Sequence, residues 1–260
     1  MNIYNFEIYG YASIAIWLLG FLIFFIKKNQ SILLSSSFIG TLVLALFIGL
    51  YWNIIDRPPM RTLAETRMWY AFFLGAIGSF MFLRWKQSWI PIFTQLLAIL
   101  FIIINITHPE TYNKSLMPAL QSIWFIPHVI VYMLAYSFLA ASFVFAIKAL
   151  IISEKKLEFT IKLTDNIVYI GFSFLTLGLL FGALWAKKAW GHYWTWDPKE
   201  TWAFITWIAY LIYIHYRHQS NKTDRSSAYI LLFAFALLII CWFGVQYLPS
   251  ASNSVHTYAY

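Results

Sequence analysis

Eight long apolar stretches divide this chain of 260 residues, and they limit its fold more than any other feature. Each is long enough, or nearly so, for a helix to cross the ~30 Å hydrocarbon core of a membrane. Only 11% of the residues are charged, against about 25% in an ordinary globular domain. The stretches cover residues 8–26, 31–52, 68–84, 89–106, 126–152, 166–186, 202–217 and 228–248. The sequence therefore predicts an all-α integral membrane protein, a bundle of about eight transmembrane helices that forms one domain over residues 1–260.

The net charge of +8 indicates an orientation in the membrane rather than a nucleic-acid partner, because the Lys and Arg residues lie between the apolar stretches. More of them follow the first, third, fifth and seventh stretches than the others. Since cytoplasmic loops carry the excess of Lys and Arg, both termini are expected on the extracytoplasmic side. The single cysteine, Cys241, excludes an internal disulfide and a Cys-x-x-Cys redox pair.

Four tryptophans fall within the thirteen residues of the segment 190–202, which we call the Trp-rich segment: Trp190, Trp194, Trp196 and Trp202. An aromatic belt at the membrane surface explains one or two of them. The alternative is a wall of flat, polarisable rings that packs against a large planar ligand. Part of the segment predicts a helix start, with Asp197 as N-cap, Pro198 at the first helical position and Glu200 at the third.

Two histidines, His128 and His256, stand out on the same predicted side as the Trp-rich segment. His128 begins the fifth stretch and His256 follows the eighth. Singly, each is an ordinary interfacial histidine; together they suggest two axial ligands for a haem iron, with His192 as a competing ligand. His215 lies 18 residues after Asp197, roughly 27 Å along a helix and close to the opposite membrane face. It is either a second functional site or a terminal residue that reaches the headgroups.

Several segments resemble the CcsA (ResC) family of system II cytochrome c biogenesis proteins. Trp190-Gly191-x-x-Trp194-x-Trp196-Asp197 is similar to the WWD signature of haem-handling proteins, and the continuation to Trp202 is similar to CcsA in particular. The runs 120–129 and 254–258 resemble the family segments that carry two external histidines. The likeness spans about residues 55–260.

The resemblance implies that the protein receives haem b from the cytoplasmic side, moves it outward and presents it to apocytochrome c. The two thiols of a Cys-x-x-Cys-His motif then add to the haem vinyl groups. The family partner is CcsB (ResB), thiol-reducing proteins act outside the membrane, and the location is the bacterial cytoplasmic (inner) membrane. The chain would be a subunit of a cytochrome c synthase, or haem lyase, in which the haem and the substrate thiols supply the chemistry and no catalytic side chain is expected.

Carried over residue by residue, the resemblance implies roles for three histidines. His128 and His256 would be the external axial ligands, and His215 would belong to an inner, entry-side haem site that the partner subunit completes. The residues that would hold the haem outside are Trp190, Gly191, Trp194, Trp196, Asp197 and Trp202. The residues that bind the haem propionates stay open among Lys199, Arg57, Arg61 and Arg67.

Three alternative functions are weighed against this one. A haem exporter or carrier of the CcmC type shares the WWD segment without ligation activity, but it has about six helices. An electron-transferring cytochrome b would need histidine pairs on facing membrane helices, which this sequence does not offer. A solute transporter would usually show an internal repeat with broken helices.

Overall fold

The computed structural model describes residues 5–60, 62–112, 122–219 and 225–256, and all regular secondary structure within them is helical. The prediction of an all-α membrane protein is confirmed. Eight α-helices account for nearly all of it: α1 (Asn5–Lys27), α2 (Gln30–Ile55), α3 (Leu63–Trp85), α4 (Trp89–Thr107), α5 (Phe125–Ile151), α6 (Glu154–Trp190), α7 (Pro198–Gln219) and α8 (Ser226–Ile239).

Seven of these helices are long and apolar enough to cross a membrane, where the sequence predicted about eight. The exception is α7, which carries Glu200 in its first turn and Arg217 and His218 in its last. Its membrane crossing, and with it the predicted location of both termini, stays a prediction. The chain divides into two compact units, Met1–Leu116 and Met117–Tyr260, and each is described by itself.

Two helix boundaries differ from the sequence prediction. Helix α6 has 37 residues, because it already begins in the charge-rich stretch 154–165, ahead of the apolar stretch. Charged side chains such as Glu and Lys are good helix formers, so hydropathy alone underestimates such a helix. Helix α8 ends early and passes into a π-helical turn, Ile240–Gly244, and then into short 3-10 turns up to Asn253.

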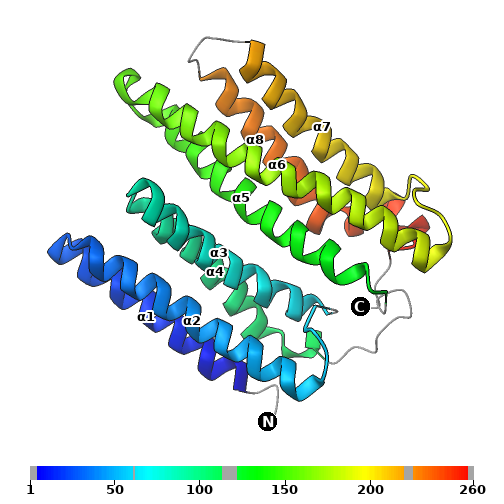
Figure 1. Cartoon of the computed structure of the whole chain (residues 1–260), viewed down its shortest axis with the longest axis horizontal. Helices are drawn as coiled ribbons and strands as arrows, with labels where there is room; N and C mark the ends of the chain where they lie inside the picture. The colour runs from blue at the N-terminus through cyan, green and yellow to red at the C-terminus, as the bar shows by residue number, and fades with distance from the viewer. Residues whose placement is uncertain (1–4, 61, 113–121, 220–224, 257–260) are drawn as a thin grey trace. The chain divides into compact units, whose positions relative to one another are not determined.

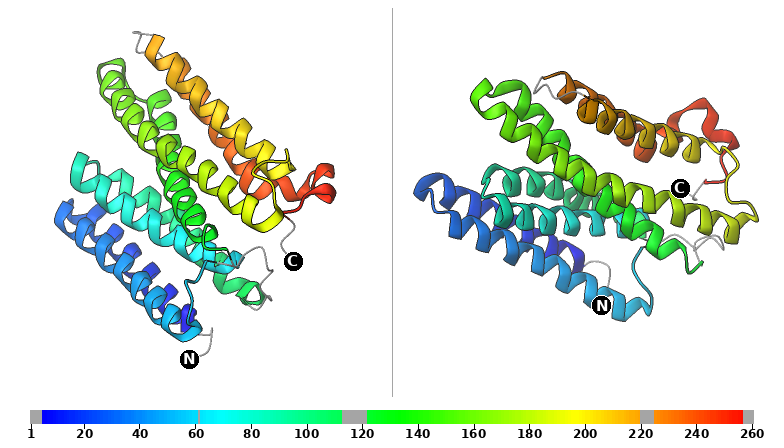
Figure 2. Two further views of the ribbon diagram at one scale, coloured as in Figure 1. Left: turned by 45° about the vertical axis from the view of Figure 1, so that its right-hand side comes forward. Right: turned by 45° about the horizontal axis from the view of Figure 1, so that its top comes forward.

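The first unit packs α1 to α4 as neighbouring antiparallel helices (Figure 2). The connection between α2 and α3 is fixed by Glu65, whose side chain is fully buried. Arg57 donates two hydrogen bonds to the Glu65 carboxylate, at 2.7 and 3.0 Å. Glu65 also completes a capping box with Thr62 at the start of α3. The paired and hydrogen-bonded carboxylate thus ties the loop to the helix that follows it.

The second unit packs α5 against α6, and α8 against α5 and α7. Glycines on α6 allow the close approach to α5: a Cβ atom added at Gly171 would lie 2.7 Å from Leu139, and one added at Gly178 would lie 2.8 Å from Tyr132. Small residues let membrane helices pack at short distance, where van der Waals contact drives their association. The start of α5, the end of α6, the start of α7 and the chain after α8 lie at one end of this unit, which we call its loop end (Figure 1).

A buried ion pair joins α6 to α7 far from the loop end. Arg217 donates to both oxygens of Asp165, with its Nε 3.0 Å from Oδ1 and its Nη2 3.1 Å from Oδ2. The Tyr213 hydroxyl donates to Oδ1 of the same carboxylate at 2.6 Å. Satisfied in this way, the charges can lie between two helices of a membrane protein without an unpaired group.

Candidate functional site

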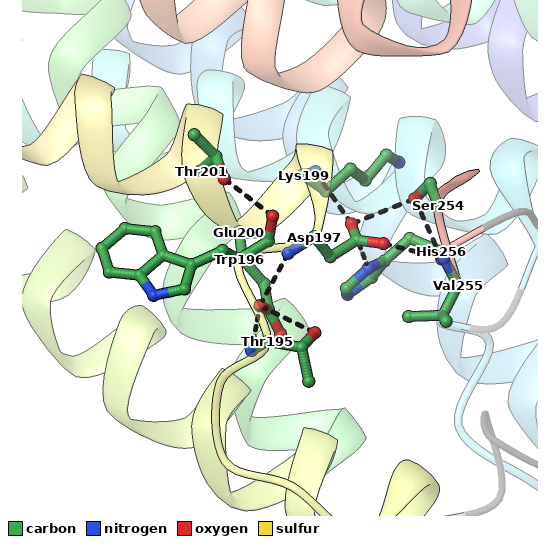
Figure 3. A network of polar contacts seen from close by, with 9 residues as sticks. All are labelled: Thr195, Trp196, Asp197, Lys199, Glu200, Thr201, Ser254, Val255 and His256. Carbon is green, nitrogen blue, oxygen red and sulfur yellow. Dashed lines mark hydrogen bonds and ion pairs between the residues drawn. The ribbon is translucent and has the colours of Figure 1, made fainter. Parts of the chain in front are cut away.

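The end of the Trp-rich segment forms the cap of α7, as the sequence predicted. The Asp197 carboxylate accepts a hydrogen bond from the Lys199 backbone N–H at 2.9 Å. The Glu200 carboxylate reaches back and accepts from the backbone N–H groups of Asp197, at 3.2 Å, and Thr195, at 2.8 Å. Helix α7 begins at Pro198. This reciprocal capping fixes where the loop ends and where Asp197 points (Figure 3).

The same Asp197 carboxylate also holds the segment Ser254–His256, which we call the C-terminal arm (Figure 3). It accepts hydrogen bonds from the Ser254 hydroxyl at 3.0 Å, the Val255 N–H at 2.7 Å and the His256 Nδ1 at 2.9 Å. Sequence analysis missed this role, because nothing local links a helix cap to a histidine 59 residues later. Asp197 thus joins the cap of α7 to one of the two predicted external ligands.

Asp197 stays ionised over a wide pH range. Burial alone would raise its pKa, but the hydrogen bond and the charge of His256, together with the Lys199 and Val255 N–H groups, lower the pKa to about 2. The side chain is 2% exposed. A carboxylate in this state only accepts hydrogen bonds, so every group that contacts it must donate.

The other predicted external ligand, His128, lies in the first turn of α5 and packs against α6. Its Nδ1 lies 2.9 Å from the backbone oxygen of Gly178. The ring lies so close to Gly182 that a Cβ atom there would be 2.8 Å from its Cε1 and 3.0 Å from its Nδ1. Glycine at 182 is therefore required to seat the imidazole against the helix.

The hydrogen bonds of the two histidines fix their tautomers. A backbone carbonyl and an ionised carboxylate have no proton to give, so Nδ1 donates in both His128 and His256. In the neutral imidazole, the lone pair then lies on Nε2. Metal-bound histidines usually donate their other ring N–H to a carboxylate or a backbone carbonyl in this way. In its neutral form each ring therefore offers Nε2 as the nitrogen for iron ligation.

The structure brings these two histidines together at the loop end. Both contact the buried Trp185 of α6: its ring centroid lies 5.4 Å from that of His128 and 5.6 Å from that of His256. The two imidazole centroids are therefore at most about 11 Å apart, the sum of the two distances. Trp190 lies against the same group, 4.6 Å from His256 and 4.8 Å from Trp185.

Two other tryptophans of the Trp-rich segment, Trp194 and Trp196, belong to a second aromatic group. Trp194 and Trp196 contact each other at 5.7 Å, and both contact Phe204 of α7. The Trp194 Nε1 is buried without a hydrogen-bond partner among the described residues. Trp196 is 62% exposed and has a φ of 61°, in the left-handed region that a bulky residue rarely adopts.

Three further residues of the Trp-rich segment are singled out by the sequence. Gly191 ends α6 with a φ of 87°, a conformation that glycine adopts without strain. Trp202 is half-buried near the start of α7, and His192 is exposed in the loop.

His215 is not brought to this group. It lies near the other end of α7, exposed, with its Nδ1 2.9 Å from the backbone oxygen of Leu211. That carbonyl only accepts, so the same argument places the lone pair of His215 on Nε2. Because the side chain is exposed, the imidazole faces outward from the unit rather than into it.

Of the basic residues left open for propionates, Arg57 is taken up by Glu65 in the first unit. Arg67 is half-buried on α3, and Arg61 lies outside the described residues. Lys199 lies in the same unit as the two external histidines and close to Asp197. Lys199 is thus the basic residue among these that shares a unit with the candidate site.

The fit of His128 against Gly182 yields a direct prediction. Gly182→Ala should displace the imidazole and destabilise the protein by about 1–3 kcal/mol, the usual cost of inserting a methyl group into a packed contact. Gly49→Ala is the matched control, since a Cβ atom there meets nothing within 4 Å. Thermal unfolding in detergent should show a lower melting temperature for Gly182→Ala and an unchanged melting temperature for Gly49→Ala. Equal melting temperatures would contradict the tight seat.

Comparison with known proteins gives the family. The family model described as cytochrome C assembly protein matches residues 6–251. A cytochrome c biogenesis protein CcsA of Guillardia theta is 32% identical, over 96% of this chain and 92% of the relative. Those of Prochlorococcus marinus (strain MIT 9312) and Mesostigma viride are each 29% identical, over 88% and 100% of this chain and 86% and 99% of the relative. With its seven apolar helices and these matches, the chain belongs to the cytochrome c assembly protein family.

Proposed function

We propose that this multi-pass membrane protein moves haem b across the membrane and presents it to apocytochrome c for attachment at a Cys-x-x-Cys-His motif. Membership of the family gives the chain a role in cytochrome c biogenesis and haem handling. The relatives carry the name cytochrome c biogenesis protein CcsA, which supports the same step for this chain. We place the protein in the bacterial cytoplasmic membrane, with the loop end on the extracytoplasmic side.

The observation that carries the proposal is the pair of imidazoles at the loop end. His128 and His256 come from opposite ends of the second unit's sequence and contact one indole ring, that of Trp185. Each uses Nδ1 for a hydrogen bond and holds its lone pair on Nε2. A haem iron bound by two histidines needs two such nitrogens and an apolar surrounding for the ring.

The aromatic side chains at the loop end, one beside the pair and two in the second aromatic group, suit a porphyrin. Trp190 lies against His256, and the Trp194 Nε1 is a buried donor without a partner in the described chain, which a bound ligand can supply. Trp196 combines a strained backbone with an exposed ring. Strained backbone is often found where a side chain contacts a ligand, and contact with the haem would account for both properties.

In this function the protein supplies position rather than a nucleophile. The haem brings the vinyl groups and the substrate protein brings the thiols, so the membrane protein has to hold one beside the other. Fixing reacting groups in place removes much of the entropic part of the barrier. The rigid seat of His128 and the hydrogen bonds of His256 to Asp197 serve this purpose.

The test of this proposal is the absorption spectrum of the chain purified with bound haem. His128→Gly and His256→Gly should each remove the low-spin signal of the outer haem, because each deletes one axial ligand. Added imidazole should restore the signal, since it can occupy the space left by the side chain. His192→Gly is the control and should leave the spectrum unchanged. A low-spin signal that is unchanged in both the His128→Gly and the His256→Gly variant would refute the outer site.

An inner haem site is proposed at His215. Its imidazole faces outward from the unit near the end opposite the loop end, which leaves it accessible to a second membrane polypeptide. One histidine is a ligand short for a bis-histidine haem, and His218, three residues further along the same helix, cannot reach the opposite haem face. We therefore assign the second ligand to a partner subunit of the CcsB type.

The partner assignment predicts a two-chain signal. This chain purified alone should hold haem poorly at the inner site, and co-expression with the partner should give a low-spin signal that His215→Ala removes. His218→Ala serves as the control in the same helical turn. A full inner-site signal from this chain alone, dependent on His215, would show that no second polypeptide is needed.

The strained position of Trp196 separates stability from ligand binding. Trp196→Gly should relieve about 1 kcal/mol of backbone strain but lose ring contacts of similar size with Trp194 and Phe204, so the melting temperature should change little. It should also lower the haem content, because the ring is lost. Lys86→Gly is the control, since Lys86 has a φ of 54° at the end of α3, far along the sequence from the site. Haem content that stays the same in both variants would remove Trp196 from the binding site.

A further inference from the structure

The two proposed outer ligands are held in different ways. His128 belongs to the first turn of α5 and is wedged against Gly182 of α6. Its Nδ1 is bonded to the Gly178 backbone, and its ring stacks on the buried Trp185. To move this imidazole away from the site, the packing between α5 and α6 would have to open.

His256 instead belongs to the C-terminal arm, which follows the last 3-10 turn and lies outside the helices. The arm is bound to Asp197 through three groups: the Ser254 hydroxyl, the Val255 N–H and the His256 Nδ1. All three are contacts to one carboxylate at the start of α7 (Figure 3). They can break together, along with the contacts of the His256 ring to Trp185 and Trp190, while every helix of the unit stays packed.

This difference decides which of the two histidines can dissociate from the iron and be replaced. A ligand that leaves the iron but stays within reach rebinds at a very high effective concentration. His128 has no room to withdraw, so it rebinds before another histidine can enter. His256 withdraws with the arm, and only then is a coordination position open to a competitor.

We propose, building on the outer haem site above, that His256 is the exchangeable ligand and that the histidine of the apocytochrome Cys-x-x-Cys-His motif takes its place. In this step the bond between iron and His256 Nε2 breaks and a bond between iron and the substrate histidine forms. No electron is transferred, and His256 keeps its Nδ1 proton. His128 stays bound throughout and keeps the haem seated while the thiols react.

Asp197 is the positioning residue of this exchange. A carboxylate that accepts the Nδ1 proton of a ligating histidine makes it a stronger ligand, so the closed arm retains the haem. Asn cannot replace it, because both oxygens accept: Oδ1 accepts from three groups and Oδ2 accepts from Val255. Either orientation of an Asn amide would set an NH₂ group against a donor.

A peptide with a Ser-x-x-Ser-His motif tests the assignment, because it offers the histidine without thiols that could react. It is added to the haem-loaded chain carrying His256→Gly or His128→Gly, each first shown to regain a low-spin spectrum with imidazole. We expect the peptide to restore the low-spin spectrum of the His256→Gly variant at a concentration at least about tenfold lower than for His128→Gly, a difference of about 1.4 kcal/mol.

A second measurement follows exchange with both histidines present. A fluorophore on the peptide is quenched by the haem when the peptide binds, which gives the rate of replacement. Asp197→Asn should raise this rate about tenfold, because the arm is loosened. Ser252→Ala is the control: Ser252 is exposed just before the arm and its hydroxyl donates to Pro249. Its rate should equal that of the unchanged chain.

The outcomes separate the two proposals. Equal peptide rescue of both glycine variants, or stronger rescue of His128→Gly, would overturn the exchange through His256 and leave the outer haem site standing. An unchanged rate in Asp197→Asn would overturn the positioning role of Asp197. If neither glycine variant alters the haem spectrum, the outer site itself is wrong and the exchange falls with it.

Discussion

One carboxylate organises the loop end of the second unit. Asp197 accepts hydrogen bonds from the first turn of α7 and from the C-terminal arm. It therefore joins the start of one helix to the chain segment that follows the last helix. Its low pKa, about 2, keeps it charged at every pH at which the protein is expected to work. The position of His256, the edge-to-face contacts of Trp190 and the start of α7 all depend on that one charge.

Sequence reasoning reached the helices and the placement of His128 and His256 at one end of the second unit, because apolar length and chain direction determine both. It also reached the capping role of Asp197, since the Asp-Pro-x-Glu order is local. It did not reach the contacts of Asp197 with the arm or of His128 with Gly178, which join residues 59 and 50 positions apart. Such contacts follow from the packing of α5 on α6 and from the path of the chain after α8, which leave no local pattern.

The aromatic residues show the same limit. The four tryptophans of the Trp-rich segment indicated one continuous wall, yet the structure divides the aromatic side chains into two groups. Trp190 joins Trp185 and the histidines, whereas Trp194 and Trp196 contact each other and Phe204. Trp185, the indole that both imidazoles contact, lies before the segment, in the last turns of α6. The number of tryptophans predicted an aromatic site but not which indole ring contacts which histidine.

The length of α6 has a mechanical consequence. Its 37 residues span about 56 Å, nearly twice the ~30 Å core of a membrane. One end of this rod carries Gly178, Gly182 and Trp185, which seat His128, and the other end begins in a charged, exposed stretch. The Asp165–Arg217 ion pair joins α6 to α7 closer to that charged end. A protein that tilted the charged end would therefore also tilt the seat of His128, which lies about one membrane thickness away along the same helix.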